Sequence, residues 1–495
     1  MKQRNSILLA FVILAAAVAF GATPAKSGTD TSETGKLPIT TKSEDARKEF
    51  LEGRDLADRL LAPKSLEHFN KALALDPEFA SAELARANAS PTAKEFQDHL
   101  KKAVELSDKA SEGEKLMILV NEAGANGDVT KQKQALDKLI AEYPSDERVQ
   151  FAMGGYYFGQ QDYAEAIEHY KKATEIAPNY SPAYNILGYS YRQASDYSNA
   201  ELAFKKYTEL IPNDPNPYDS YAELLLRMGR FEESTTQYRK ALSIDPSFNP
   251  SRFGISAALT YMGKPEDAQS ELQTMAKRAA NDGQLRTAYF GMAVLASDRG
   301  KFDDALKAMD KEYAVAEKKN DVTSMSQDLQ AKGNILAAAQ RYDAAQQAFE
   351  QSFRMVQDSN LSPELKQNAQ RQHHFNMSAV AIGKGDLAGA KMHAAEFREA
   401  AEASNNPLQV KQWHELMGRI ALAEKDYDKA IDELQQANEQ NPQNLFRLGE
   451  AYEAKGDHAK AHDFFNQAAT ANPLPQLNFA FIRAKAQKMA AANKA

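Results

Sequence analysis

Four prolines stand 34 residues apart along the middle of the chain: Pro144, Pro178, Pro212 and Pro246. Proline cannot continue a helix, because it has no backbone N–H and its ring clashes with the preceding turn. Residues 147–248 divide at these prolines into three blocks of 34 residues, each with two apolar patterns of helical spacing around a polar turn. Self-similarity at this period predicts an array of stacked helix pairs.

The apolar positions of the middle block indicate how such a pair packs. Each helix places bulky and small residues on one face, namely Tyr184, Leu187, Gly188 and Tyr191, then Ala200, Phe204 and Tyr207. Two short helices cannot bury these faces alone, so each pair has to stack on its neighbours. We expect small residues such as Gly188 and Ala200 to stand where the helices cross. The array should therefore share one continuous core.

The small position of the second helix extends the pattern to both sides of the centre. It is occupied by Ser65, Gln132, Ala268, Ala305, Ala345, Ala390, Ala430 and Ala461. The spacing widens beyond Ala268, which predicts longer helices or turns between Asp282 and Asn406. We therefore expect an array of mostly 34-residue repeats over 46–282 and longer, irregular repeats over 283–474.

The last residues, 475–495, carry one more amphipathic pattern. We expect a single capping helix here, with Leu477, Phe481 and Ile482 covering the last repeat and Arg483 facing water. A terminal repeat needs such a cover, because its outer face would otherwise expose apolar side chains.

The repeat resembles the tetratricopeptide repeat family. The matching positions of the middle block are Tyr184, Leu187, Gly188, Tyr191, Ala200, Phe204 and Pro212. The longer units look like the extended repeats of kinesin light chains. This resemblance implies an all-α fold, a right-handed α-α superhelix of helix-turn-helix repeats. It also implies a protein that binds protein or peptide partners on a concave wall of first helices, without catalysis and without a cofactor.

A binding groove on that wall would be lined by first-helix residues that face away from the second helix. These candidates are Phe151, Phe158, Asn185, Tyr189, Arg192, Asp219, Glu223, Arg227, Phe253 and Tyr261. Aromatic residues and arginine are enriched at binding hot spots. The alternative is that some of these rings pack within the superhelix.

The amino terminus has the pattern of a secretory signal. Lys2 and Arg4 precede an apolar stretch from Ser6 to Phe20 that is shorter than the roughly 20 residues of a membrane-spanning helix. We expect a signal peptide over 1–21, a disordered linker over 22–45, and no membrane span in the mature form. The protein would then be exported to the periplasm or secreted, or anchored if the signal stays uncleaved.

Charge and motifs exclude several other classes. Sixty basic and sixty-eight acidic residues are spread along the chain and give a net charge of −8, which argues against nucleic acid as a partner. Cysteine is absent, so thiolate metal sites, disulfides and a Cys nucleophile are excluded. We find no nucleophile elbow, phosphate-binding loop or zinc-protease motif.

The histidines are expected to be structural, with no metal site. His393 stands at a solvated helical position and His374 at the bulky position of a first helix. His458 and His462 share one helical face, but no third ligand accompanies them.

The leading prediction is an exported scaffold that organises protein complexes in the bacterial cell envelope. An accessory module of polysaccharide or peptidoglycan machinery is the alternative, and an enzyme is a third hypothesis. The sequence names neither the partner nor an oligomeric state.

Overall fold

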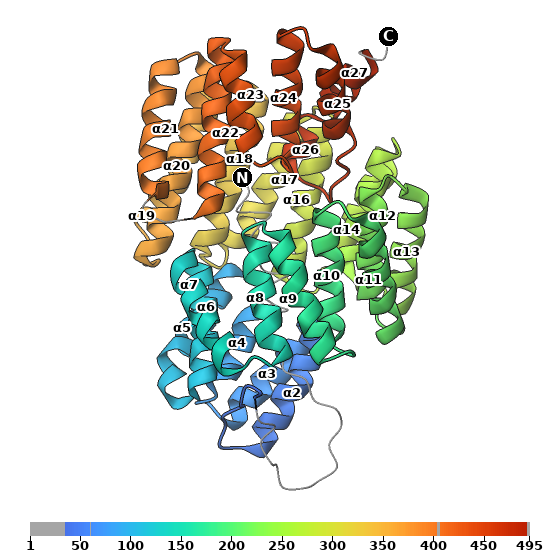
Figure 1. Ribbon diagram of the computed structural model, residues 1–495, viewed down its shortest axis with the longest axis vertical. Coiled ribbons are helices and arrows are strands. Elements are labelled where there is room, and N and C mark those ends of the chain that lie inside the picture. Colours follow the sequence, from blue (N-terminus) through green and yellow to red (C-terminus); the bar gives the residue numbers. More distant parts are fainter. Residues whose placement is uncertain (1–34, 60, 403–405, 493–495) are drawn as a thin grey trace. The chain divides into compact units, whose positions relative to one another are not determined.

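The computed structural model describes residues 35–59, 61–402 and 406–492, and this part of the chain contains helices and no strand. Within each of the two units described below, consecutive helices pack as antiparallel pairs, and successive pairs stack on one another, as Figure 1 shows. The expected all-α fold of packed helix pairs is confirmed for the described residues. The expected signal peptide over 1–21 lies outside the described residues, as does the linker as far as residue 34.

The helices form two compact units, which are described separately. Of the described residues, the N-terminal unit contains 35–224 and 239–248, and the C-terminal unit contains 225–238 and 249–492. The boundary between the units falls inside two helices, α12 (Asn216–Arg227) and α13 (Phe231–Ile244).

The N-terminal unit begins with five helix pairs and one short 3₁₀ turn. In chain order these are α2 (Glu44–Asp58), α3 (Ala62–Leu75), α4 (Ala80–Asn88), α5 (Ala93–Leu106), the 3₁₀ turn Ser107–Lys109, α6 (Glu112–Asn126), α7 (Val129–Glu142), α8 (Glu147–Gly159), α9 (Tyr163–Ile176), α10 (Ser181–Gln193) and α11 (Tyr197–Leu210).

The C-terminal unit continues the pattern and ends with two short helices. In chain order these are α14 (Asn249–Tyr261), α15 (Pro265–Lys277), α16 (Asp282–Asp298), α17 (Phe302–Glu317), α18 (Val322–Ala338), α19 (Tyr342–Gln357), α20 (Pro363–Lys384), α21 (Leu387–Glu402), α22 (Pro407–Glu424), α23 (Tyr427–Gln436), α24 (Pro442–Ala454), α25 (His458–Ala469), α26 (Leu477–Ala480) and α27 (Arg483–Ala492).

Glycines of the first helices allow the two helices of a pair to approach closely. A Cβ atom on Gly188 would lie 2.7 Å from the ring of Phe204, and one on Gly449 would lie 2.6 Å from the ring of Phe465. The aromatic ring of the second helix therefore occupies the space that a side chain would fill. The small residue one turn before the ring, such as Ala200, is completely buried.

From α6 and α7 onward, the turn inside each pair is tight and uses a left-handed backbone. Gly263, Gly300 and Gly385 adopt positive φ there, and Ser195 and Gln340 adopt the same conformation without being glycine. Glycine takes this conformation without the steric cost that a Cβ atom brings.

The longer repeats gain their length in the helices. The first and second helices of the regular repeats, such as α10 and α11, have 13 and 14 residues. By contrast, α16 has 17 residues and α20 has 22, while the turns between paired helices stay short.

The expected disordered linker over 22–45 needs correction in its described part. Residues 35–43 pack on the N-terminal unit, where Leu37 is buried and its backbone N–H donates to Asp146. The helix also begins earlier than expected, because the Ser43 side chain accepts a hydrogen bond from the N–H of Ala46 and caps α2.

The expected single capping helix over 475–495 also needs correction. The chain forms α26, turns, and then forms α27, which packs on α25 of the last repeat. Leu477 does not cover the last repeat but joins a cluster with α16 and α18 residues. Arg483, which was expected to face water, forms an ion pair with Asp298 of α16.

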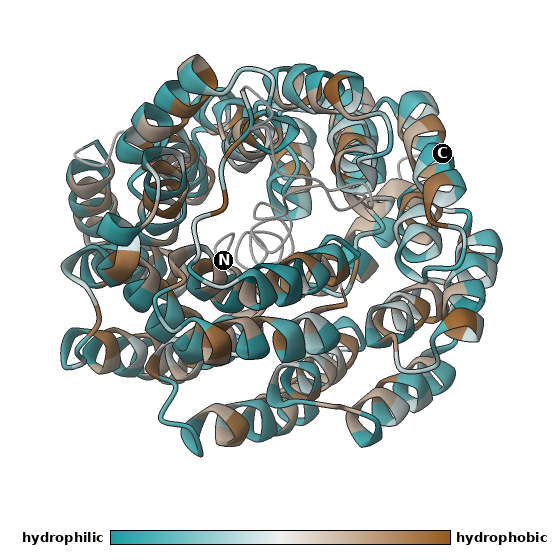
Figure 2. Cartoon of the chain, turned by 90° about the horizontal axis from the view of Figure 1, so that it is seen from below, coloured by the Kyte–Doolittle hydropathy of each residue, from teal (hydrophilic) through white to brown (hydrophobic). Residues whose placement is uncertain are grey.

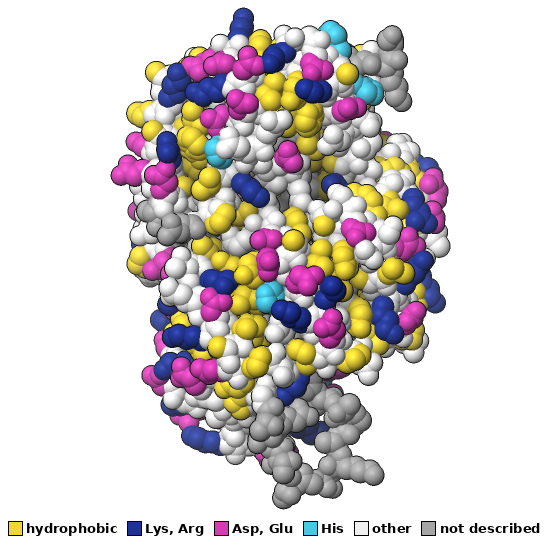
Figure 3. Space-filling view, viewed as in Figure 1, with side chains coloured by type: hydrophobic (Ala, Val, Ile, Leu, Met, Phe, Trp, Pro, Cys, Tyr) yellow, Lys and Arg dark blue, Asp and Glu magenta, His cyan; other side chains and the backbone are white. Residues whose placement is uncertain are grey.

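The outer surface is polar and mixed in charge. In Figure 2 the helices carry both hydrophilic and hydrophobic residues, as amphipathic packing requires. On the face drawn in Figure 3, basic and acidic side chains are interspersed. Among the described residues, no helix combines the length and apolar character needed to cross a bilayer.

Candidate peptide-binding surface

First helices of successive repeats lie beside one another and form a wall. In the C-terminal unit, α14 contacts α16, α20 contacts α22, and α22 contacts α24. We call the part of this surface formed by Arg227 and helices α14, α16 and α18 the inner wall. Its small residues, such as Ala257 and Ala293, are buried.

A segment of the same chain lies on the inner wall. This segment, residues 471–482, leaves the last repeat and places α26 against α16, α18 and α24. Leu477 is buried with Phe290, Val294 and Ile335 in one hydrophobic cluster. Leu474 packs on a second cluster that contains Leu226, Ala257 and Ala258.

The inner wall binds the backbone of this segment through two side chains. Arg227 donates a hydrogen bond from its guanidinium to the carbonyl oxygen of Ala471. Tyr261 donates from its hydroxyl to the carbonyl oxygen of Pro473. Both donors belong to first helices, and both were predicted from the sequence to line a groove. A main-chain carbonyl is present in every peptide, so these two contacts do not depend on the side chains of the bound segment.

Side chains then hold the segment in one register. The ring of Phe479 meets the ring of Tyr261 edge to face, with 5.6 Å between centroids. The guanidinium of Arg483 binds both carboxylate oxygens of Asp298, one of them at 2.6 Å, and lies 5.5 Å from the Tyr261 ring. A bidentate pair of this kind has a fixed geometry. Tyr261 therefore contacts the backbone, an aromatic ring and a cation of the bound region.

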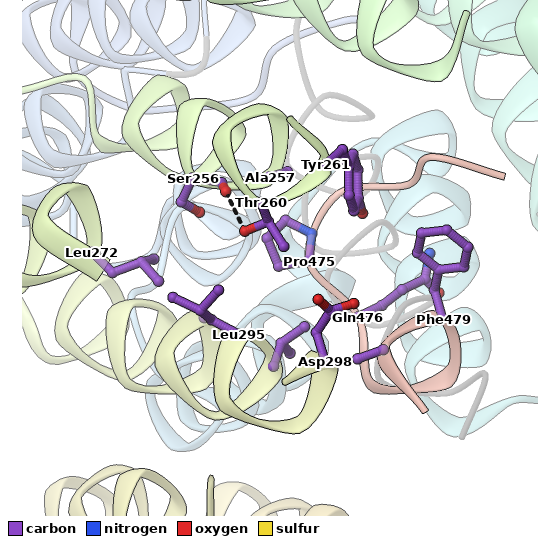
Figure 4. A pocket seen from close by; sticks show the side chains of 13 residues that line it. Ser256, Ala257, Thr260, Tyr261, Leu272, Leu295, Asp298, Pro475, Gln476 and Phe479 are labelled. Atoms are coloured by element: carbon purple, nitrogen blue, oxygen red, sulfur yellow. Dashed lines mark hydrogen bonds between the residues drawn. The ribbon is translucent and has the colours of Figure 1, made fainter. Parts of the chain in front are cut away.

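The fit between the segment and the inner wall is close. Figure 4 shows Tyr261, Asp298 and Thr260 of the wall facing Pro475, Gln476 and Phe479 of the segment around a small cavity. The cavity measures about 20 Å³. A space of that size holds roughly one water molecule. Burial raises the pKa of Tyr261 far above its ordinary value, so its hydroxyl keeps the proton that it donates.

Phe253, the third predicted groove residue in this unit, has a different position. Its ring lies against Gly291 of α16, and it packs with the cluster that contains Phe290 and Ala293. It therefore helps to join α14 to α16.

In the N-terminal unit, the predicted groove residues Phe151 and Phe158 are core residues. The Phe151 ring is 5.3 Å from that of Tyr170 and 5.6 Å from that of Tyr180. Phe158 meets Tyr163 of the paired helix. Both rings are buried, and so are Asn185 and Asp219. Helical spacing is the same for first-helix residues that face a groove and for those that pack on a neighbouring repeat. The sequence pattern therefore does not distinguish groove residues from core residues.

Tyr189, Arg192 and Glu223 form one half-buried polar group. Arg192 donates to Glu223 at 3.1 Å, and its guanidinium lies 4.6 Å from the centre of the Tyr189 ring. Burial raises the pKa of Glu223, while Arg192 and Tyr189 oppose that rise. Arg192 is thus already paired across two repeats.

The N-terminal unit holds a second extended segment, residues 36–42, which the sequence did not suggest. Its backbone N–H groups donate to carboxylates of three successive repeats: Leu37 to Asp146 at 2.8 Å, Thr40 to Glu114 at 2.9 Å, and Lys42 to Asp76 at 3.0 Å. Carboxylates that accept backbone N–H groups form strong, charge-assisted bonds. Only the regular placement of acidic residues near the start of each first helix could have indicated this row of acceptors.

Matches to family models agree with this repeat architecture. The tetratricopeptide repeat family matches residues 147–180, 181–214, 216–248 and 416–474. The crystal structure of the APC/C hetero-tetramer Cut9-Hcn1 has a chain that is 15% identical, with a TM-score of 0.42, covering 86% of this chain and 76% of that one. The crystal structure of MamA gives 18% identity, a TM-score of 0.27, and coverage of 34% and 96%. No curated protein matches the sequence significantly.

The repeat matches fall on α8 to α13 and on α22 to α25, and the described helices between and before them pack as the same kind of pair. Such repeats support a protein-interaction scaffold. The chain thus contains tetratricopeptide repeats in residues 147–248 and 416–474.

Proposed function

We propose that this protein is an exported scaffold of the bacterial cell envelope, and that it binds an extended segment of a partner protein on the inner wall. The observation that carries the proposal is the pair of hydrogen bonds from Arg227 and Tyr261 to the carbonyls of Ala471 and Pro473. These contacts are those that a peptide-binding wall makes with its ligand.

In this proposal, residues 471–482 are a built-in ligand that a partner segment replaces. A partner with an apolar residue for the Leu477 position and an aromatic residue for the Phe479 position would satisfy the same clusters. Because the chain's own segment competes for the wall, the apparent affinity for a partner is the intrinsic affinity multiplied by the fraction of molecules that are open.

The test uses a labelled synthetic peptide with the sequence of residues 470–484 as the probe. The full chain carrying Leu477→Asp should release its own segment, because a carboxylate cannot be buried in that apolar cluster without a large cost. We expect the peptide to bind this variant in a fluorescence-anisotropy titration and to show little binding to the wild type.

Gln487→Asp is the matched control, because it adds the same side chain at an exposed position of α27. This variant should behave as the wild type, and a probe that itself carries Asp at its Leu477 position should bind neither protein. Leu477→Ala, with the helical content checked by circular dichroism, separates release from unfolding. Absence of probe binding to both folded Leu477 variants contradicts a reversible peptide site.

Export is supported by the basic and apolar pattern of residues 1–21 and by the absence of cysteine, which suits an oxidising compartment. Expression of the full chain in a bacterial host, fractionation and mass spectrometry of the protein's amino terminus test it. We expect the periplasmic or secreted form to begin after Ala19 or Gly21. A full-length protein confined to the cytoplasm contradicts this part of the proposal.

A further inference from the structure

Three potential ligand atoms converge between α20 and α21 of the C-terminal unit. His374 Nδ1 lies 3.4 Å from His393 Nδ1. Glu396 Oε2 lies 2.8 Å from the His374 nitrogen and 3.0 Å from the His393 nitrogen. The carboxylate reaches both rings because Glu396 follows His393 by one helical turn.

The corresponding position in other repeats shows what is unusual here. In the pairs Glu49 and His68, Gln150 and His169, and His414 and Glu433, one imidazole faces one carboxylate or amide across the two helices, at 2.8, 2.9 and 2.7 Å. That arrangement is a simple structural hydrogen bond. Between α20 and α21, both residues of the pair are histidine, and a carboxylate is added to them.

We propose that His374, His393 and Glu396 bind a divalent transition-metal ion of the Zn²⁺ class. Two imidazoles and one carboxylate are a donor set that zinc takes, with bonds of about 2.0–2.2 Å and a fourth position left for water or another ligand. In a tetrahedral site with such bonds, neighbouring ligand atoms lie roughly 3.3 Å apart. The observed separations of 3.4, 2.8 and 3.0 Å are close to that spacing.

The surroundings suit an ion that enters from solvent. His374 and His393 are largely buried, with side chains 16% and 19% exposed, whereas Glu396 is 45% exposed. The neighbouring His373 does not point into the site, because its ring stacks on Phe353 with 4.5 Å between centroids. His374 comes from α20 and His393 from α21, so the ion would join the two packed helices on the solvent-exposed side where Glu396 lies.

The test measures Zn²⁺ binding by the full chain in competition with a chromophoric chelator. We expect one ion per chain at this site, and Co²⁺ in its place should give the visible absorption of a four-coordinate site. His374→Ala and His393→Ala should each weaken Zn²⁺ binding at least about tenfold, because mutating even a residue that only hydrogen-bonds to a metal ligand lowers metal affinity by about that factor. Glu396→Gln, at a more exposed position, should weaken binding without risk to folding.

His414→Ala is the matched control, because it removes the histidine of the ordinary pair and should leave Zn²⁺ binding unchanged. The double variant His374→Ala, His393→Ala keeps His458 and His462, so it also reports binding elsewhere on the chain. A wild type that binds no more Zn²⁺ than this double variant overturns the proposal, and so does unchanged affinity in Glu396→Gln.

Discussion

Ala200 shows how tightly the helix pair is packed at the level of a single residue. It is completely buried one turn before Phe204, whose ring fills the space above Gly188. We expect Ala200→Leu to lower the free energy of unfolding by about 1–3 kcal/mol, because the added atoms overpack a filled contact. Urea unfolding followed by circular dichroism measures it. Leu202→Ala, on the exposed face of the same helix, should change stability by less than about 0.5 kcal/mol.

His169 is a single residue whose surroundings predict a pH effect. Burial lowers the pKa of its imidazole, and the nearby Lys172 and Lys133 lower it further, although Glu168 opposes them. Its ring stacks on Tyr157 at 5.5 Å. The folded protein therefore resists protonation of His169 more than the unfolded chain does.

The sign of the effect follows from proton binding. An unfolded histidine titrates near pH 6.5, so below that pH the unfolded chain binds more protons and the free energy of unfolding falls. We expect the wild type to lose stability relative to His169→Gln as the pH falls from about 7.5 to 5.5, in urea titrations of both proteins. Parallel curves for the two proteins would rule out this contribution.

At the scale of the element, the turn inside the helix pairs from α6 and α7 onward requires one residue with a left-handed backbone. Gly263 has a φ of 73°, and open space surrounds the position that its Cβ would occupy. We expect Gly263→Ala to cost about 1 kcal/mol through the backbone alone. Gln340→Gly, at a φ of 60°, should give a smaller gain, because glycine also increases the entropy of the unfolded chain. Thermal unfolding of both variants measures the two changes in stability. We expect the melting temperature to fall more in Gly263→Ala than it rises in Gln340→Gly.

Helices were predictable from the sequence where their buried side chains recur at regular intervals along the chain. The positions of Gly188, Ala200 and Phe204 recur because every pair has the same crossing, and this recurrence indicated the repeat and its boundaries. The extended segment 36–42 leaves no such mark, because its backbone N–H groups make the hydrogen bonds. Its polar composition therefore suggested a linker.

The candidate site was predictable only in part, for a similar reason. Helical spacing placed Arg227 and Tyr261 on the first-helix surface, where they do contact an extended segment. The same spacing gave Phe151, which packs between Tyr170 and Tyr180. An amphipathic pattern at Leu477 shows that the residue needs an apolar contact, but it does not show which surface provides the contact.

At the scale of the whole molecule, the buried ion pair between Arg483 and Asp298 fixes the end of the segment 471–482 to α16. We expect its loss to destabilise the protein more than the loss of an exposed ion pair does. Arg483 and Asp298 are 15% and 7% exposed, so Arg483→Met leaves a buried carboxylate without its partner. We expect a loss of about 3 kcal/mol in the C-terminal unit and faster amide hydrogen exchange in residues 471–482 and in α16. Lys307→Met, which breaks an exposed pair with Asp304, should leave exchange in these regions unchanged.

The same segment changes the order in which the C-terminal unit can fold. In a repeat array each pair contacts its neighbours, so folding can proceed along the chain as it is synthesised. Here Arg227 meets Ala471 and Asp298 meets Arg483, which follow them by 244 and 185 residues along the chain. The inner wall therefore stays uncovered until the ribosome has made residues 471–483, well after the wall itself has been synthesised.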